Sequence, residues 1–96
     1  MPATINTMTN MCENKSLVEL IVWVSTGKPI DFRDVIYALE ICIKSGLNAK
    51  FIYLFNRFIK QDLPNKLVER LATLTRIHKN RLLIRYLDSY LPVTQN

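Results

Sequence analysis

Apolar residues recur every three or four positions along most of the chain, which is the period of an amphipathic α-helix. The clearest case begins after Asp31, a good N-cap residue, and ends at Gly46. Its main apolar positions are Phe32, Val35, Ile36, Leu39 and Ile43. Because Asp34 stands near the positive end of the helix dipole, the segment predicts a stable helix with a wide buried face.

The segment 17–24 is more ambiguous, because seven of its eight residues are apolar. A buried strand shows the same pattern in so short a run. Ser16 and Glu19, however, have the S-x-x-E spacing of a capping box, and Gly27 with Pro29 forms a stop signal. We therefore expect a helix here as well.

Two further regions complete the pattern. Asn48 is a candidate N-cap for a helix that reaches about Gln61, and Pro64 suits the first turn of the next helix. Residues 65–91 contain no proline or glycine, but their two leucine-rich stripes are out of phase. The phase slip predicts either two helices joined near His78–Asn80 or one kinked helix.

Together these segments predict an all-α fold, a compact bundle of four or five short helices. The prolines and both glycines lie at or outside the ends of the expected helices, so the local signals agree with one another. No self-similar motif recurs, so a solenoid of sequence repeats is not expected. Residues 1–14 are polar and aperiodic and are predicted to form a flexible N-terminal arm, and residues 15–96 a single helical domain.

Composition excludes several kinds of site. The 96-residue chain has 49% hydrophobic and 22% charged residues, enough for one core and unlike a disordered chain. Phosphate-binding loops need clustered glycines, whereas Gly27 and Gly46 are isolated. The only cysteines and histidine, Cys12, Cys42 and His78, lack the spacing of a zinc site. We expect no metal, no cofactor and no small-molecule substrate.

The chain also lacks the pattern of an enzyme. His78 has no carboxylate close in sequence, and Asp31 and Asp34 are better explained as helix caps than as an acid–base pair. Cys42 stands between two isoleucines and is expected to be a buried, inert thiol. No signal peptide or membrane-length apolar run is evident, so we expect an intracellular protein, in the cytoplasm or nucleus, with no membrane partner.

Charge is distributed unevenly along the chain. Residues 1–50 hold five basic and five acidic residues, and residues 51–96 hold eight basic and three acidic ones, so the second half supplies the whole net charge of +5. Helical spacing places several basic residues on shared faces. The candidate binding residues for nucleic acid or an acidic partner are Arg57, Lys60, Lys66, Arg70, Arg76, His78, Lys79, Arg81 and Arg85. A solvated helix face has the same pattern.

Two functional hypotheses follow. The first is a non-enzymatic protein–protein interaction module, a small adaptor, accessory or regulatory subunit that forms a homodimer through its apolar first half. Trp23, with Leu20 and Val24, is the candidate interface, although Trp23 also fits a core position. The alternative is a nucleic-acid-binding protein that reads backbone shape, with double-stranded RNA as one candidate.

The aromatic residues add little support to the second hypothesis. Phe51, Phe55 and Phe58 are in phase with aliphatic residues and are expected in the core. Tyr53 and Tyr86 are the better candidates for exposed rings that could stack on bases.

Overall fold

The computed structural model describes residues 7–61 and 64–90, and within them every regular element is a helix. The elements are α1 (Thr7–Asn14), α2 (Leu17–Ser25), α3 (Phe32–Ser45), α4 (Asn48–Leu54), the π-helix η1 (Phe55–Ile59), α5 (Asn65–Ile77) and α6 (Arg81–Asp88). The predicted all-α fold is confirmed. Six α-helices are described instead of four or five.

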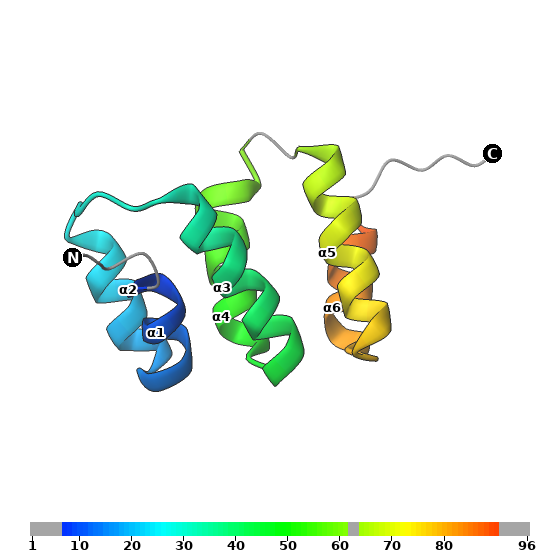
Figure 1. The fold of residues 1–96 in the computed structure, drawn as a ribbon, viewed down its shortest axis with the longest axis horizontal. Coiled ribbons are helices and arrows are strands. Elements are labelled where there is room, and N and C mark those ends of the chain that lie inside the picture. Colours follow the sequence, from blue (N-terminus) through cyan, green and yellow to red (C-terminus); the bar gives the residue numbers. More distant parts are fainter. Residues whose placement is uncertain (1–6, 62–63, 91–96) are drawn as a thin grey trace.

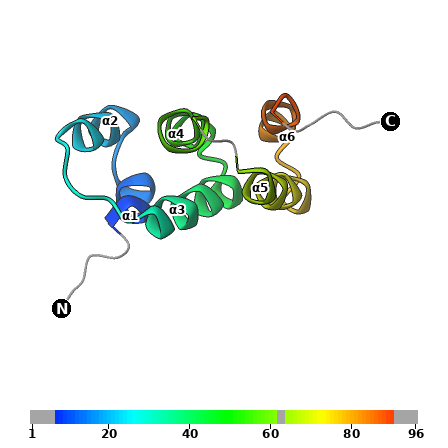
Figure 2. The same cartoon turned by 90° about the horizontal axis from the view of Figure 1, so that it is seen from above.

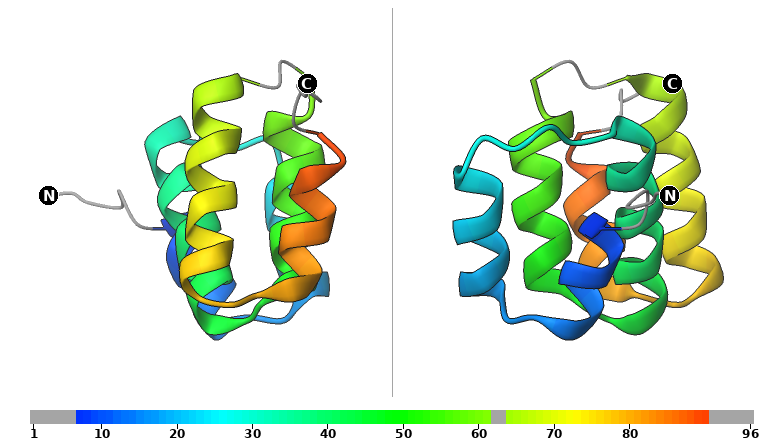
Figure 3. Two further views of the ribbon diagram at one scale, coloured as in Figure 1. Left: turned by 90° about the vertical axis from the view of Figure 1, so that its right-hand side faces the viewer. Right: turned by 60° about the vertical axis from the view of Figure 1, so that its left-hand side comes forward.

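The helices form three antiparallel pairs, α1–α2, α3–α4 and α5–α6, which stand side by side in a row (Figure 1). Figure 2 shows two layers, with α1, α3 and α5 in one and α2, α4 and α6 in the other. Figure 3 shows the end pairs, with α5–α6 nearest the viewer on the left and α1–α2 brought forward on the right. Stacked helix pairs of this kind are typical of α-solenoids, although no sequence motif repeats here.

The expectation of a flexible arm over residues 1–14 is wrong for residues 7–14. Thr7–Asn14 forms helix α1, which packs against α3 and buries Met8, Thr9 and Cys12. Met8 and Cys12 are four residues apart and therefore lie on one side of the helix, facing the core. Residues 1–6 of the predicted arm lie outside the described residues.

Both ends of α1 are held by side chains from other helices. At its N-terminus, the amides of Met8 and Thr9 donate to the Asp34 carboxylate at 2.7 and 3.3 Å, and Thr9 Oγ1 donates to it at 3.2 Å. Near its C-terminus, Lys50 Nζ donates to the carbonyls of Cys12, at 2.6 Å, and Lys15. A carboxylate thus meets the positive end of the helix dipole and an ammonium the negative end.

The predicted caps of α2 and α3 are confirmed. Ser16 and Glu19 form the full capping box at 3.1 Å each way, and these hydrogen bonds hold the pKa of the Glu19 carboxyl below its usual range. Asp31 caps α3 by accepting from the amide of Arg33 at 2.9 Å, which likewise lowers the pKa of Asp31. Gly46 ends α3 with a φ of 72°, the left-handed conformation that glycine adopts most readily.

The third expected helix begins and continues differently from the prediction. Asn48 is the first residue of α4, and Leu47 precedes it at the cap position without a side-chain hydrogen bond. After Leu54 the chain widens into η1, in which the amide of Lys60 donates to the carbonyl of Phe55 five residues back. In the second half, two helices joined at residues 78–80 replace the alternative of one kinked helix.

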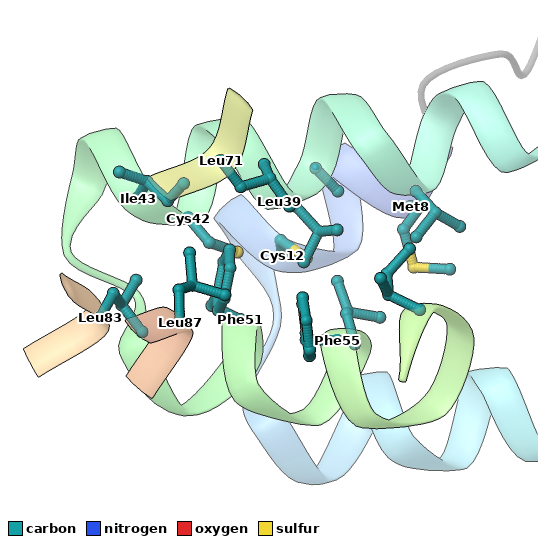
Figure 4. Close-up of a cluster of buried hydrophobic side chains, with 14 of the residues drawn as sticks. Met8, Cys12, Leu39, Cys42, Ile43, Phe51, Phe55, Leu71, Leu83 and Leu87 are labelled. Atoms are coloured by element: carbon teal, nitrogen blue, oxygen red, sulfur yellow. The ribbon is translucent and has the colours of Figure 1, made fainter. Parts of the chain in front are cut away.

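The core runs through all three pairs (Figure 4). Its central part comes from α3 and α4–η1, because this pair has neighbours on both sides. Phe51 and Phe55 are fully buried, as expected, and Phe58 is half-buried. The two buried rings stack with centroids 5.9 Å apart.

We expect Asp34→Ala to lower the free energy of unfolding by about 2–3 kcal/mol, because it leaves the first amides of α1 without their charged acceptor. Urea denaturation measures this loss. Hydrogen exchange should show the amides of Met8 and Thr9 losing protection. Asp31→Ala is the matched control, because it removes a local cap and an exposed ion pair with Arg33 and should cost about 1 kcal/mol. Equal protection of α1 in the two variants would contradict the role of Asp34.

Candidate functional site

Helix α2 lies at one end of the row (Figure 2). Its outer side exposes apolar residues. The solvent-facing aliphatic side chains are Val18, Ile21 and Val22, with exposed fractions of 68%, 37% and 59%. The only charged residue of α2 is Glu19, whose carboxylate is already engaged in the capping box. Among residues 7–61 and 64–90, no helix lies over these apolar side chains.

The sequence-based choice of interface residues on this helix is wrong for two of three positions. Leu20 and Val24 are buried in the chain's own core, because they form the side of α2 that faces the rest of the row. Trp23 is half-buried and packs against the same core. The exposed face consists instead of residues on the opposite side of the helix, which the uniform apolarity of the segment could not distinguish.

The nine basic candidates do not form one continuous face. Arg70 Nη2 lies 2.9 Å from the Glu40 carboxylate of α3, and Arg76 donates to the Asp88 carboxylate of α6 at 3.1 Å. These ion pairs join α5 to its two neighbours, so both arginines have structural partners. Two other candidates lie over aromatic rings.

The guanidinium of Arg57 lies 5.2 Å from the centroid of the Phe58 ring, and Lys60 Nζ lies 6.0 Å from that of Tyr90. Both are distances at which a cation is attracted to the face of a ring. Lys66 is exposed in the first turn of α5, at the far end of that helix from His78.

Three of the remaining candidates do come together. His78, Lys79 and Arg81 line a shallow groove of about 510 Å³ beside the turn between α5 and α6. Lys44, in the last turn of α3, lines the same groove, and none of the lining residues is acidic. Arg85 lies one turn away, beside an apolar depression that it shares with Arg81, Leu82 and Tyr86.

Lys44 is the residue that sequence reasoning missed. It belongs to the first half of the chain, whose net charge is zero, and is separated from His78 by 34 positions. Its contribution depends on the α3–α4 and α5–α6 turns lying at the same edge of the row (Figure 1). The proximity of Lys44 to His78 follows only from the way the helices pair.

A hydrogen-bond network fixes the two turns relative to each other. Asn80 Nδ2 donates to Asn48 Oδ1 at 2.8 Å and to the carbonyl of Ile43 at 3.4 Å. Asn80 Oδ1 also caps α6 by accepting from the amide of Leu83 at 3.3 Å. Asn48 therefore serves this contact instead of capping its own helix.

Lys79 has a φ of 56°, the only positive value among the described non-glycine residues. This left-handed position follows the end of α5, where glycine or asparagine is the usual residue. A lysine here costs conformational energy and adds a cation to the groove.

Both tyrosines that were considered for base stacking pack against the core. Tyr86, like Tyr53, is half-buried, and its ring packs edge-on against Phe51 and Phe55. Burial raises the pKa of Tyr86, and its hydroxyl donates to Asn56 Oδ1 at 3.0 Å. The ring is therefore a core element and not the exposed stacking surface that was considered.

Cys42 is fully buried, as expected for a thiol between two isoleucines, and Cys12 of α1 is buried near it (Figure 4). The hydrogen bond with Cys12, together with burial, raises the pKa of the Cys42 thiol. A raised pKa keeps this thiol protonated and unreactive at neutral pH.

Comparisons with known proteins give no relative: no family model, curated protein or solved structure matches the chain. In the described ranges, no three histidine, cysteine or acidic side chains are grouped so as to hold a metal ion. Nor does any helix there combine the length and apolarity needed to cross a membrane. The candidate sites therefore rest on the two surfaces just described, the apolar face of α2 and the basic groove.

We expect Lys79→Gly to raise the free energy of unfolding by about 0.5–1 kcal/mol, because glycine adopts positive φ without a Cβ clash. Thermal and urea denaturation measure the change. His78→Gly is the control, since His78 has a negative φ of −91° and glycine there brings no such relief. A stability of Lys79→Gly at or below that of the natural sequence would contradict the strained backbone.

Proposed function

We propose that the chain is a non-enzymatic helical interaction module that associates with a second copy of itself through the exposed face of α2. The observation that supports this proposal most directly is the exposure of Val18, Ile21 and Val22 at the end of the row. Burying such side chains against a matching surface is favourable at about 25 cal/mol per Å² of apolar area. The row of helix pairs serves as the rigid support for that face.

The distribution of charge favours the binding of a second copy at the α2 end of the molecule. All of the net positive charge lies in residues 51–96, so two copies that met through their C-terminal halves would repel each other. The first half is neutral, and α2 carries the single charge of Glu19. A two-fold symmetric contact places the same aliphatic patch on both sides, which makes the face of α2 complementary to itself.

The area of the exposed α2 face limits the expected affinity of the dimer. A nine-residue helix is about 13 Å long, so it buries less than the roughly 800 Å² per partner of a standard interface. We therefore expect a reversible dimer with a dissociation constant on the order of ten micromolar or weaker, unless a larger partner covers more of the surface.

We expect Val22→Lys to abolish self-association, because it places a lysine from each copy at the centre of the contact. Sedimentation velocity over a wide concentration range should show a monomer–dimer equilibrium for the natural sequence and a monomer for the variant. Val22 is exposed, so circular dichroism should show the fold unchanged.

Thr73→Lys is the matched control, because it adds the same charge at an exposed position of α5, away from α2. It should associate as the natural sequence does. A natural sequence that stays monomeric at every concentration would reject the proposal. Equal losses in Val22→Lys and Thr73→Lys would instead point to general charge repulsion.

A further inference from the structure

The groove between the α3–α4 and α5–α6 turns holds basic side chains that the fold leaves without an anion. In the part of the chain that the structure describes, the ion pairs are Arg33–Asp31, Arg70–Glu40 and Arg76–Asp88. None of them includes Lys44, Lys79 or Arg81. No acidic side chain lines the groove itself, and Glu40, which lines the neighbouring depression with Lys44 and His78, is already paired with Arg70. The groove cations therefore raise the local positive potential.

Helix dipoles explain only part of this cluster. Lys44 is in the last turn of α3 and Lys79 follows the end of α5, where positive charge is stabilising. Arg81 is the first residue of α6, at the positive end of its helix, where a cation is unfavourable. The unfavourable placement of Arg81, without a carboxylate partner, calls for an anion from outside the chain.

The shape and rigidity of the groove also suit an anion. It is shallow and polar, and Asn80 ties its two walls together through Asn48 and the carbonyl of Ile43. The cations therefore cannot relieve their mutual repulsion by a separation of the two turns. Gly46, at its rim, has open space where a side chain would stand, so a ligand can approach the backbone there.

From these observations we infer that the groove binds a phosphate group, with Arg81, Lys79 and Lys44 as its charged contacts. A terminal phosphate group carries a charge of about −1.5 to −2 on three oxygens, whereas a carboxylate offers one charge on two. Three cations that line one groove match the phosphate better, and the planar guanidinium of Arg81 can hold two of its oxygens at once. The inference goes beyond self-association and does not depend on it.

The phosphate has two chemical sources: a free polyphosphate compound, which has terminal phosphates, and the backbone of a nucleic acid, whose successive phosphodiesters each carry one negative charge. Isothermal titration calorimetry of the full chain with inorganic tripolyphosphate, and separately with an oligoribonucleotide, distinguishes them. Poly-glutamate is the control anion. Two-dimensional NMR of the labelled chain locates the contact, and the amides of Gly46, Lys79 and Arg81 should shift.

Arg81→Ala and Lys44→Ala should each weaken binding of the phosphate ligand about tenfold or more, as expected for lost charge-assisted contacts. Lys66→Ala is the matched control: it removes the same charge from an exposed position about 18 Å along α5 from His78, and should bind nearly as tightly as the natural sequence. All three positions are at least partly exposed on the surface of the structure. Circular dichroism verifies that the variants are folded.

Binding of tripolyphosphate, of the oligoribonucleotide or of both supports the groove, provided that the groove amides shift and the Arg81 and Lys44 variants lose affinity. The ligand that binds identifies the source of the phosphate. The inference is overturned if neither phosphate ligand binds at about 50 mM salt. It is equally overturned if poly-glutamate binds as tightly as the phosphates, or if Lys66→Ala loses as much affinity as Arg81→Ala.

Discussion

The carboxylate of Asp34 is the contact on which the N-terminal end of the row depends. A side chain that caps a helix normally precedes it in sequence and accepts from its second or third amide. Asp34 accepts from those same amides of α1 although it lies some 25 residues further along. With Lys50 at the other end, α1 receives both of its charged caps from the central helix pair. α1 can therefore form only where α3 and α4 are already in place.

That dependence explains the surface available for function. Once α1 is docked on α3, its neighbour α2 is placed at the end of the second layer, with Leu20 and Val24 turned inward. Within the described ranges, no helix covers the remaining side of α2. At the other end, the same stacking brings the turn after α5 beside the turn after α3, and so assembles a basic groove from two separate segments. The two candidate surfaces are thus products of one arrangement.

The sequence predicts most of the elements, because the periodicity of α3 is clear and the capping signals of α2 and α3 resolve what periodicity alone leaves open. Ser16, Asp31 and Gly46 act as the pattern indicates, and the phase slip near residue 78 marks a true helix boundary. Helix α1 could not be predicted, since its segment is polar and its caps come from distant residues. Local periodicity contains no information about Asp34 reaching Met8.

The candidate sites were harder to predict than the fold for the same reason. In α2, nearly every position is apolar, so the sequence cannot say which side faces the core. Helical spacing places several of the nine basic candidates on shared faces, yet Arg70 and Arg76 are held by carboxylates of adjacent helices. Lys44 joined the groove only through the pairing of two turns. Contacts between helices, and not helical spacing, decide which charges are available.

The row arrangement also has a consequence for how the chain folds. The main helix contacts join elements that are neighbours or next neighbours along the chain, such as α3 with α4, α1 with α3 and α3 with α5. Contacts of short sequence separation have a low loop-closure cost and favour rapid folding. Since α1 needs caps from the central pair and α5 packs on α3, the route that these contacts favour begins at α3–α4. Folding then spreads outward from this pair, with α1 among the last helices to form.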